Sequence, residues 1–163
     1  MIRGVTVGER LREERRSRFV GREAELELVR QALDEPDRSF TVLFIHGPGG
    51  VGKTALMRAI ADLCESEGAP AIRLDLRSIE PSPPAFRNAL AELLEAPGNV
   101  DIAGLLQAAG PRVLMLDTYE SAGALDPWLR DRFLPTLPAH TFVVIAGRGG
   151  PDRQWLADPG WRE

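Results

Sequence analysis

Eight consecutive residues form the pattern with the clearest chemical meaning in the chain. Gly47-Pro-Gly-Gly-Val-Gly-Lys-Thr54 fits GxxxxGK[ST] at every fixed position. Glycines let successive backbone N–H groups turn toward one anion, because no Cβ atom blocks the approach. Lys53 would reach the β- and γ-phosphates of a nucleotide, and the Thr54 hydroxyl would bind Mg²⁺. The residues predicted to contact the nucleotide here are Gly47, Pro48, Gly49, Gly50, Val51, Gly52, Lys53, Thr54 and Ala55.

The composition singles out the same lysine. Of the 20 basic residues, all but Lys53 are arginine. An ammonium group on a flexible stem and a planar guanidinium reach different oxygens, so the two are not interchangeable. A lysine kept at this one position indicates that it binds a small, specific anion.

A second glycine pattern overlaps the first. Gly47-x-Gly49-x-x-Gly52 also fits GxGxxG, and Asp75 follows about 20 residues after it, as in dinucleotide-binding folds. That alternative has no use for Lys53 and Thr54, and a lone GxGxxG match is weak evidence. We therefore expect Asp75 to be a polar residue at a strand end, and the dinucleotide site remains an alternative.

Three further residues complete a predicted catalytic set with Lys53. Asp117 ends the apolar stretch that begins at Val113, so it would share Mg²⁺ with Thr54. Glu120 would orient the attacking water, although a first-turn helix acid is an equally good interpretation. Arg148 follows another apolar stretch and would contact the γ-phosphate, the alternative being an exposed loop arginine.

The elements that must position these residues alternate along the chain. Helical spacing of apolar residues predicts helices, and short runs rich in β-branched residues predict buried strands. This alternation predicts an α/β fold, a three-layer sandwich with a mostly parallel sheet. Strands are expected over 40–46, 71–76, 113–117 and 141–146, and helices over 22–33, 55–63, 84–96, 102–109 and 125–134. The three tryptophans, Trp128, Trp155 and Trp161, are expected to pack against sequence outside this chain.

Charge and length limit the remaining functions. The net charge is -4 over 163 residues, which argues against direct nucleic-acid binding by this segment. The apolar runs are far shorter than the roughly 20 residues of a membrane span, and one cysteine excludes an internal disulfide. We expect a cytoplasmic protein with a charged arm (1–18), a core (19–150) and the start of a continuation (151–163).

The order of these motifs resembles one family. Phe19-Val-Gly-Arg-Glu-Ala-Glu-Leu26, the glycine loop, Leu116-Asp117 and the strand before Arg148 occur as in the STAND branch of the AAA-like P-loop ATPases. The resemblance covers roughly residues 19–150 and implies a P-loop NTPase fold, truncated before the C-terminal lid. It implies that Val20 and Gly21 contact the adenine, that Arg22 closes the pocket, and that ATP or ADP binds with Mg²⁺.

The same resemblance implies a role. STAND proteins are nucleotide switches in bacterial signalling and transcriptional regulation, and C-terminal domains of the longer protein carry the output. We therefore expect a switch domain that binds Mg-ATP and hydrolyses it slowly, with a nucleotide-dependent oligomer as a further expectation. Many relatives place a second acid directly after the first, and Thr118 stands there instead. An ATP-dependent phosphotransferase and a passive interaction module are the alternatives.

Overall fold

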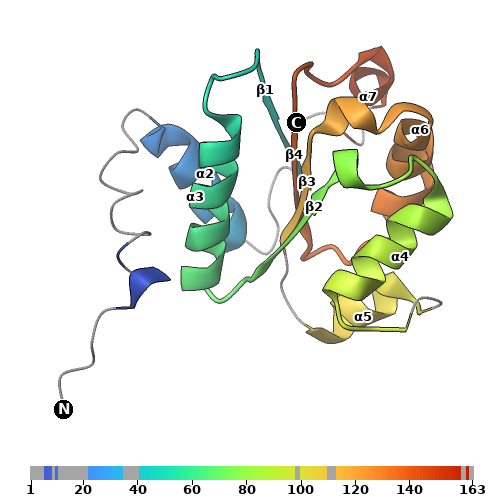
Figure 1. The fold of residues 1–163 in the computed structure, drawn as a ribbon, viewed down its shortest axis with the longest axis horizontal. Coiled ribbons are helices and arrows are strands. Elements are labelled where there is room, and N and C mark those ends of the chain that lie inside the picture. Colours follow the sequence, from blue (N-terminus) through green and yellow to red (C-terminus); the bar gives the residue numbers. More distant parts are fainter. Residues whose placement is uncertain are drawn as a thin grey trace.

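The four segments predicted as strands form one parallel sheet in the computed structural model (Figure 1). The strands are β1 (Val42–His46), β2 (Ala71–Asp75), β3 (Val113–Asp117) and β4 (Phe142–Gly147). The structure describes residues 6–8, 10, 22–34, 41–97, 100–109, 113–158 and 161. Most of the predicted arm, and both Val20 and Gly21, lie outside these residues.

The strand order is β1-β4-β3-β2, so β4 lies between the two strands that end in the glycine loop and in Asp117. His46 pairs with Gly147, Leu116 with Ile145, and Asp75 with Asp117. Because all the strands are parallel, their carboxyl ends meet at one edge of the sheet. We call this the carboxyl edge.

Helices cover both faces of the sheet (Figure 1). On one face lie α2 (Glu23–Asp34) and α3 (Lys53–Ser66), and on the other lie α4 (Pro83–Leu93), α5 (Ile102–Ala109), α6 (Asp126–Trp128) and α7 (Arg153–Ala157). The connection from β1 leads to β2 at the opposite edge of the sheet. The connections from β2 to β3 and from β3 to β4 lead back toward β1. Right-handed crossovers in opposite directions require opposite faces. The three-layer α/β prediction is therefore confirmed.

The alternation of side chains along the strands divides the core in two. Leu114, Leu116 and Ile145 pack with α4 to α7, whereas Met115 and Val144 pack with α2 and α3. Every residue of β3 and β4 is buried, while the strands at the two edges are only partly so. Within the described part of the chain, no helix is long and apolar enough to cross a membrane.

The helix expected over 125–134 is irregular. Short 3₁₀ turns, η3 (Gly123–Leu125) and η5 (Leu134–Thr136), flank α6 and a π-helical segment, η4 (Leu129–Phe133). Pro135, within η5, has no backbone N–H, so one helical hydrogen bond is missing there. The prediction was correct for helical backbone and wrong for its regularity.

The tryptophans do not behave as expected. Trp155 is 2% exposed and packs edge-on against Phe44 at a centroid distance of 5.0 Å. Trp128 stacks on Phe133 at 5.3 Å. Both rings complete the core on the face covered by α4 to α7, so the expectation that they pack outside this chain is wrong.

Candidate functional site

The glycine loop joins the carboxyl end of β1 to the first turn of α3. Gly50 (φ 81°) and Gly52 (φ 91°) have left-handed backbone conformations, which L side chains rarely adopt. A Cβ atom at Gly49, Gly50 or Gly52 would meet nothing within 4 Å, so open space lies beside the loop. The loop therefore leads into the N-terminus of a 14-residue helix, where backbone N–H groups and the helix dipole favour an anion.

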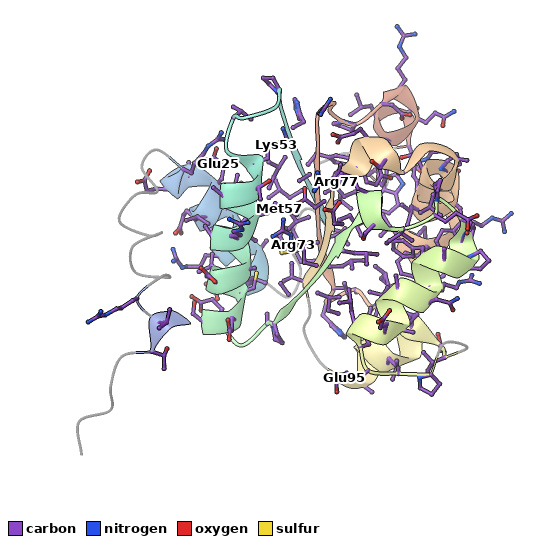
Figure 2. All side chains as sticks on the ribbon, viewed as in Figure 1. Glu25, Lys53, Met57, Arg73, Arg77 and Glu95 are labelled. Carbon is purple, nitrogen blue, oxygen red and sulfur yellow. The ribbon has the colours of Figure 1, made fainter. Side chains whose placement is uncertain are left out.

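Lys53 folds back over this loop. Its Nζ donates hydrogen bonds to the carbonyl oxygens of Gly47 (2.6 Å) and Pro48 (2.9 Å). Figure 2 shows Lys53 at the top of α3, on the side that faces the sheet. The ammonium is thus satisfied by neutral acceptors that a phosphate oxygen would replace with a stronger, charge-assisted bond.

Arg22 lies against the same loop. Its Nη2 donates to the Val51 carbonyl oxygen at 3.3 Å, and its Nη1 pairs with Glu25 Oε1 at 2.7 Å. The Arg22 hydrogen bond lowers the pKa of Glu25. Of the three residues expected around the adenine, Arg22 is the one that the structure describes, and it lies beside the glycine loop.

Asp117 ends β3 on the same edge. Its side chain is 11% exposed; Oδ1 accepts a hydrogen bond from the Thr118 N–H (2.8 Å), and Oδ2 pairs with Arg73 Nη2. Thr118 itself has φ 56° and ψ 47°, a costly conformation for a β-branched residue that turns the chain sharply after Asp117. Strain of this kind is often found at functional sites.

The strand register sets the distance between Asp117 and the loop. Asp117 follows the Leu116–Ile145 pair, and Gly47 follows the His46–Gly147 pair. Asp117 is therefore level with Ala146 and Ile45, two residues before Gly47. With strands roughly 4.8 Å apart and a rise of roughly 3.3 Å per residue, the Asp117 backbone lies about 12 Å from the start of the loop. Thr54, in the first turn of α3, and Asp117 offer the hard oxygen donors that Mg²⁺ prefers. No cluster of three or more metal-ligating His, Cys, Asp or Glu side chains occurs in the part of the chain that the structure describes.

Glu120 and Arg148 are brought together by a single turn. The 3₁₀ segment η2 (Tyr119–Ser121) directs Glu120 toward the end of β4. Its Oε2 accepts from the Arg148 backbone N–H and its Oε1 pairs with Arg148 Nε, both at 3.1 Å. A Cβ atom on Gly147 would lie 3.3 Å from Glu120 Oε2, so glycine leaves room for this approach. Both predicted residues lie at the carboxyl edge, with Arg148 75% exposed.

Asp75 makes its hydrogen bonds within the turn that directly follows β2. Its Oδ1 accepts from the Arg77 backbone N–H at 3.1 Å and caps the 3₁₀ turn η1 (Leu76–Ser78). The Arg77 side chain also donates to Oδ2 at 2.7 Å, and this hydrogen bond lowers the pKa of Asp75 to about 2. Asp75 is thus a polar residue at a strand end, as expected.

A buried polar cluster lies behind Glu120. Asp126 accepts hydrogen bonds from the Tyr119 hydroxyl (2.7 Å), Trp155 Nε1 (3.0 Å) and Arg130 Nη1 (3.1 Å). Burial, followed by the bond to Asp126, raises the pKa of Tyr119, which keeps the hydroxyl protonated as a donor. The cluster therefore ties η2, and with it Glu120, to α6 and α7.

Arg73 is the residue at this edge that sequence reasoning missed. It stands in the middle of β2, flanked by the buried Ile72 and Leu74. The sequence offered one signal for it. Arg73 lies two residues before Asp75, at a strand position that alternates with the apolar residues Ile72 and Leu74. Nothing in the sequence indicated that its guanidinium would pair with Asp117, 44 residues away.

Comparison with protein families gives one match. The model described as "AAA ATPase domain" matches residues 18–146, which include the glycine loop and Asp117. No curated protein matches the chain.

Several solved structures are similar to this chain. They include PCH-2 of C. elegans (14% identity, TM-score 0.50, covering 83% of this chain and 39% of that chain). The Walker-type ATPase PABY2304 of Pyrococcus abyssi covers 81% of this chain and 46% of that chain, with 16% identity and a TM-score of 0.50. The ORC2 protein of Aeropyrum pernix, in ADPNP–ADP complexes, covers 80% and 42%, with 16% identity and a TM-score of 0.51. This chain therefore spans less than half of each matched chain, and the likeness shows the P-loop NTPase fold.

Proposed function

The chain belongs to the AAA ATPase domain family, and from this premise we propose that it binds ATP and ADP with Mg²⁺ at the carboxyl edge. The observation that carries the proposal is the glycine loop. Its left-handed glycines border open space at the N-terminus of α3, and the only lysine of the chain is folded over it. These features supply backbone donors, a helix dipole and one movable cation for a phosphate chain.

Each residue has a role in this proposal. Lys53 leaves the carbonyl oxygens of Gly47 and Pro48 and, together with the loop N–H groups, binds the phosphates, while Arg22 helps to close the adenine pocket. Thr54 and Asp117 hold the metal, which when bound neutralises charge on the phosphates. The topology supports this grouping, because ligands of open α/β sheets bind outside the carboxyl ends of the strands where successive connections leave on opposite faces.

We further propose that hydrolysis is slow. Glu120 would orient the attacking water and Arg148 would contact the γ-phosphate, but here the two side chains pair with each other. Turnover then requires this exposed pair to separate, and a switch that holds ATP for a long time fits such a site. The output would be carried by C-terminal domains of a longer signal-transduction ATPase, in which this chain is the nucleotide-binding part.

The test is calorimetric titration of ATP, ADP and NAD in the presence of Mg²⁺. The Lys53→Ala variant should weaken ATP binding by roughly 30- to 150-fold, because it removes charge-assisted hydrogen bonds worth about 2–3 kcal/mol. Arg58→Ala removes the same charge from an exposed position further along α3 and should bind as the wild type does. Equal ATP affinity of the wild type and Lys53→Ala, or tighter binding of NAD than of ATP, would refute the proposal.

A further inference from the structure

Arg73 reaches Asp117 because of its register on the sheet. It pairs with Met115 across β2 and β3, so Asp117 is its diagonal neighbour two residues further on. Diagonal neighbours lie about 7–8 Å apart at their backbones, a gap that a long side chain spans. Figure 2 places Arg73, together with Met57 of α3, between that helix and the sheet.

The pair differs from the other ion pairs of the carboxyl edge. Asp75 pairs with Arg77 and Glu120 with Arg148, and the two arginine side chains are 68% and 75% exposed. In the third pair, the side chain of Asp117 is only 11% exposed and that of Arg73 is 33% exposed. The Arg73–Asp117 pair is therefore the least exposed to water of the three, and the one that solvent and salt screen least.

Both oxygens of the Asp117 carboxylate are engaged. Oδ1 accepts from the Thr118 N–H and Oδ2 from the Arg73 guanidinium. The guanidinium keeps its charge at all physiological pH values, and a strand fixes its backbone. Any divalent cation that Asp117 binds must displace this cation or accept its repulsion.

We propose that Arg73 occupies the cation position at Asp117 in the nucleotide-free protein and thereby sets the Mg²⁺ affinity of the site. The inference rests on the proposed function, since it concerns the same nucleotide site. Asp117 lies beside Asp75, its register neighbour on β2, and near Glu120. The Arg73 guanidinium offsets the negative charge of Asp117 in this acidic surrounding. It stabilises the metal-free site at the expense of the metal-bound one.

This competition predicts that the nucleotide binds first and Mg²⁺ second. The glycine loop and Lys53 bind phosphates without the help of Asp117, so nucleotide binding in the absence of metal does not depend on Arg73. The Mg²⁺ step does, because the bound phosphates must supply enough negative charge to draw the metal in against the guanidinium. Arg73 is therefore a positioning residue that acts on the metal through Asp117.

The experiment measures metal and nucleotide binding separately. A fluorescent ADP analogue is titrated in EDTA and at increasing Mg²⁺, and binding of Mn²⁺ to the ADP-loaded protein is followed by electron paramagnetic resonance. Arg73→Gln should lower the Mg²⁺ and Mn²⁺ midpoints by about tenfold or more, because removing one nearby positive charge favours a divalent ion. Its ADP affinity in EDTA should stay within about threefold of the wild-type value.

Three variants make the result specific. Arg73→Lys keeps a cation at this position and should give midpoints near those of the wild type. Arg77→Gln removes an exposed arginine of the same edge and should change the midpoints by less than about threefold. Arg73→Met retains the apolar stem, so it takes the place of Arg73→Gln if that variant unfolds, and the same drop in midpoint is expected.

The outcomes separate the two proposals. If ADP binds and the metal midpoints of Arg73→Gln and Arg73→Met equal or exceed the wild-type values, Arg73 does not compete with the metal and the inference is overturned. If the wild type binds no ADP with or without metal, the proposed function itself fails.

Discussion

The only lysine of the chain takes up a position that none of the 19 arginines could reproduce at this site. The Lys53 ammonium curls back and donates hydrogen bonds to two carbonyl oxygens of its own loop, at 2.6 and 2.9 Å. A planar guanidinium needs a wider set of acceptors in one plane, which a tight glycine loop does not offer. The residue that composition singled out is thus also the one whose side chain can move from the loop carbonyls to a phosphate.

A second residue-scale property is the acid sensitivity of Asp75. The pKa of Asp75 is lowered to about 2 in the folded protein, so its pairing with Arg77 stabilises the fold above the ordinary aspartate pKa and is lost as pH falls toward 2. Asp75→Asn keeps an acceptor for the cap of η1 but removes the charge. The difference in unfolding free energy between wild type and Asp75→Asn should therefore shrink between pH 5 and pH 2.

Urea unfolding at several pH values measures this difference. Arg77→Gln removes the cation that holds Asp75 ionised, so the unfolding free energy of this variant should also depend less on pH between pH 5 and pH 2 than that of the wild type. A pH profile of either variant that parallels the wild type from pH 5 to pH 2 would show that the pair does not act on stability.

At the scale of elements, the Asp126 cluster holds together segments that are distant in sequence. It joins η2, which follows β3, to α7, which follows β4, and the buried Arg130 of η4 also pairs with Asp131. The two connections that carry Glu120 and Arg148 are therefore fixed to one carboxylate.

Removing that carboxylate should be costly. Asp126→Ala leaves the Tyr119 hydroxyl and the Trp155 N–H buried without an acceptor, so we expect a loss of about 2–4 kcal/mol in unfolding free energy. Asp131→Ala is the matched control, since the side chain of Asp131 is 55% exposed and water screens its pairing, which should therefore contribute far less to stability. Chemical denaturation compares them; equal losses in the two variants would mean that the buried cluster does not stabilise these connections.

The elements also show what sequence reasoning could predict. The four strands and the glycine loop were predictable, because a buried parallel strand is a continuous apolar run and the phosphate pattern depends on local residue types. The pairing of Arg73 with Asp117 was not, because it depends on strand order and register. The burial of Trp155 was missed for a similar reason. Its partner Phe44 lies on β1, the edge strand opposite β2, so this contact also depends on strand order. The roles of all the predicted site residues, from Val20 and the glycine loop to Asp117, Glu120 and Arg148, stay predictions.

For the whole molecule, the strand order explains why the predicted residues lie along one edge of the sheet. Since β4 lies between β1 and β3, Arg148 falls between the glycine loop and Asp117, and α3 and the later helices leave on opposite faces. The chain spans between 39% and 46% of the three solved chains compared here.

We propose that the glycine loop and Lys53 hold a triphosphate while Thr54 and Asp117 hold its metal, and a crystal structure with Mg²⁺ and a non-hydrolysable ATP analogue is the decisive test. We expect Lys53 Nζ to leave the carbonyl oxygens of Gly47 and Pro48 for phosphate oxygens, with the metal between Thr54 and Asp117. A structure in which the analogue binds elsewhere, with Lys53 still on those carbonyl oxygens, would contradict it.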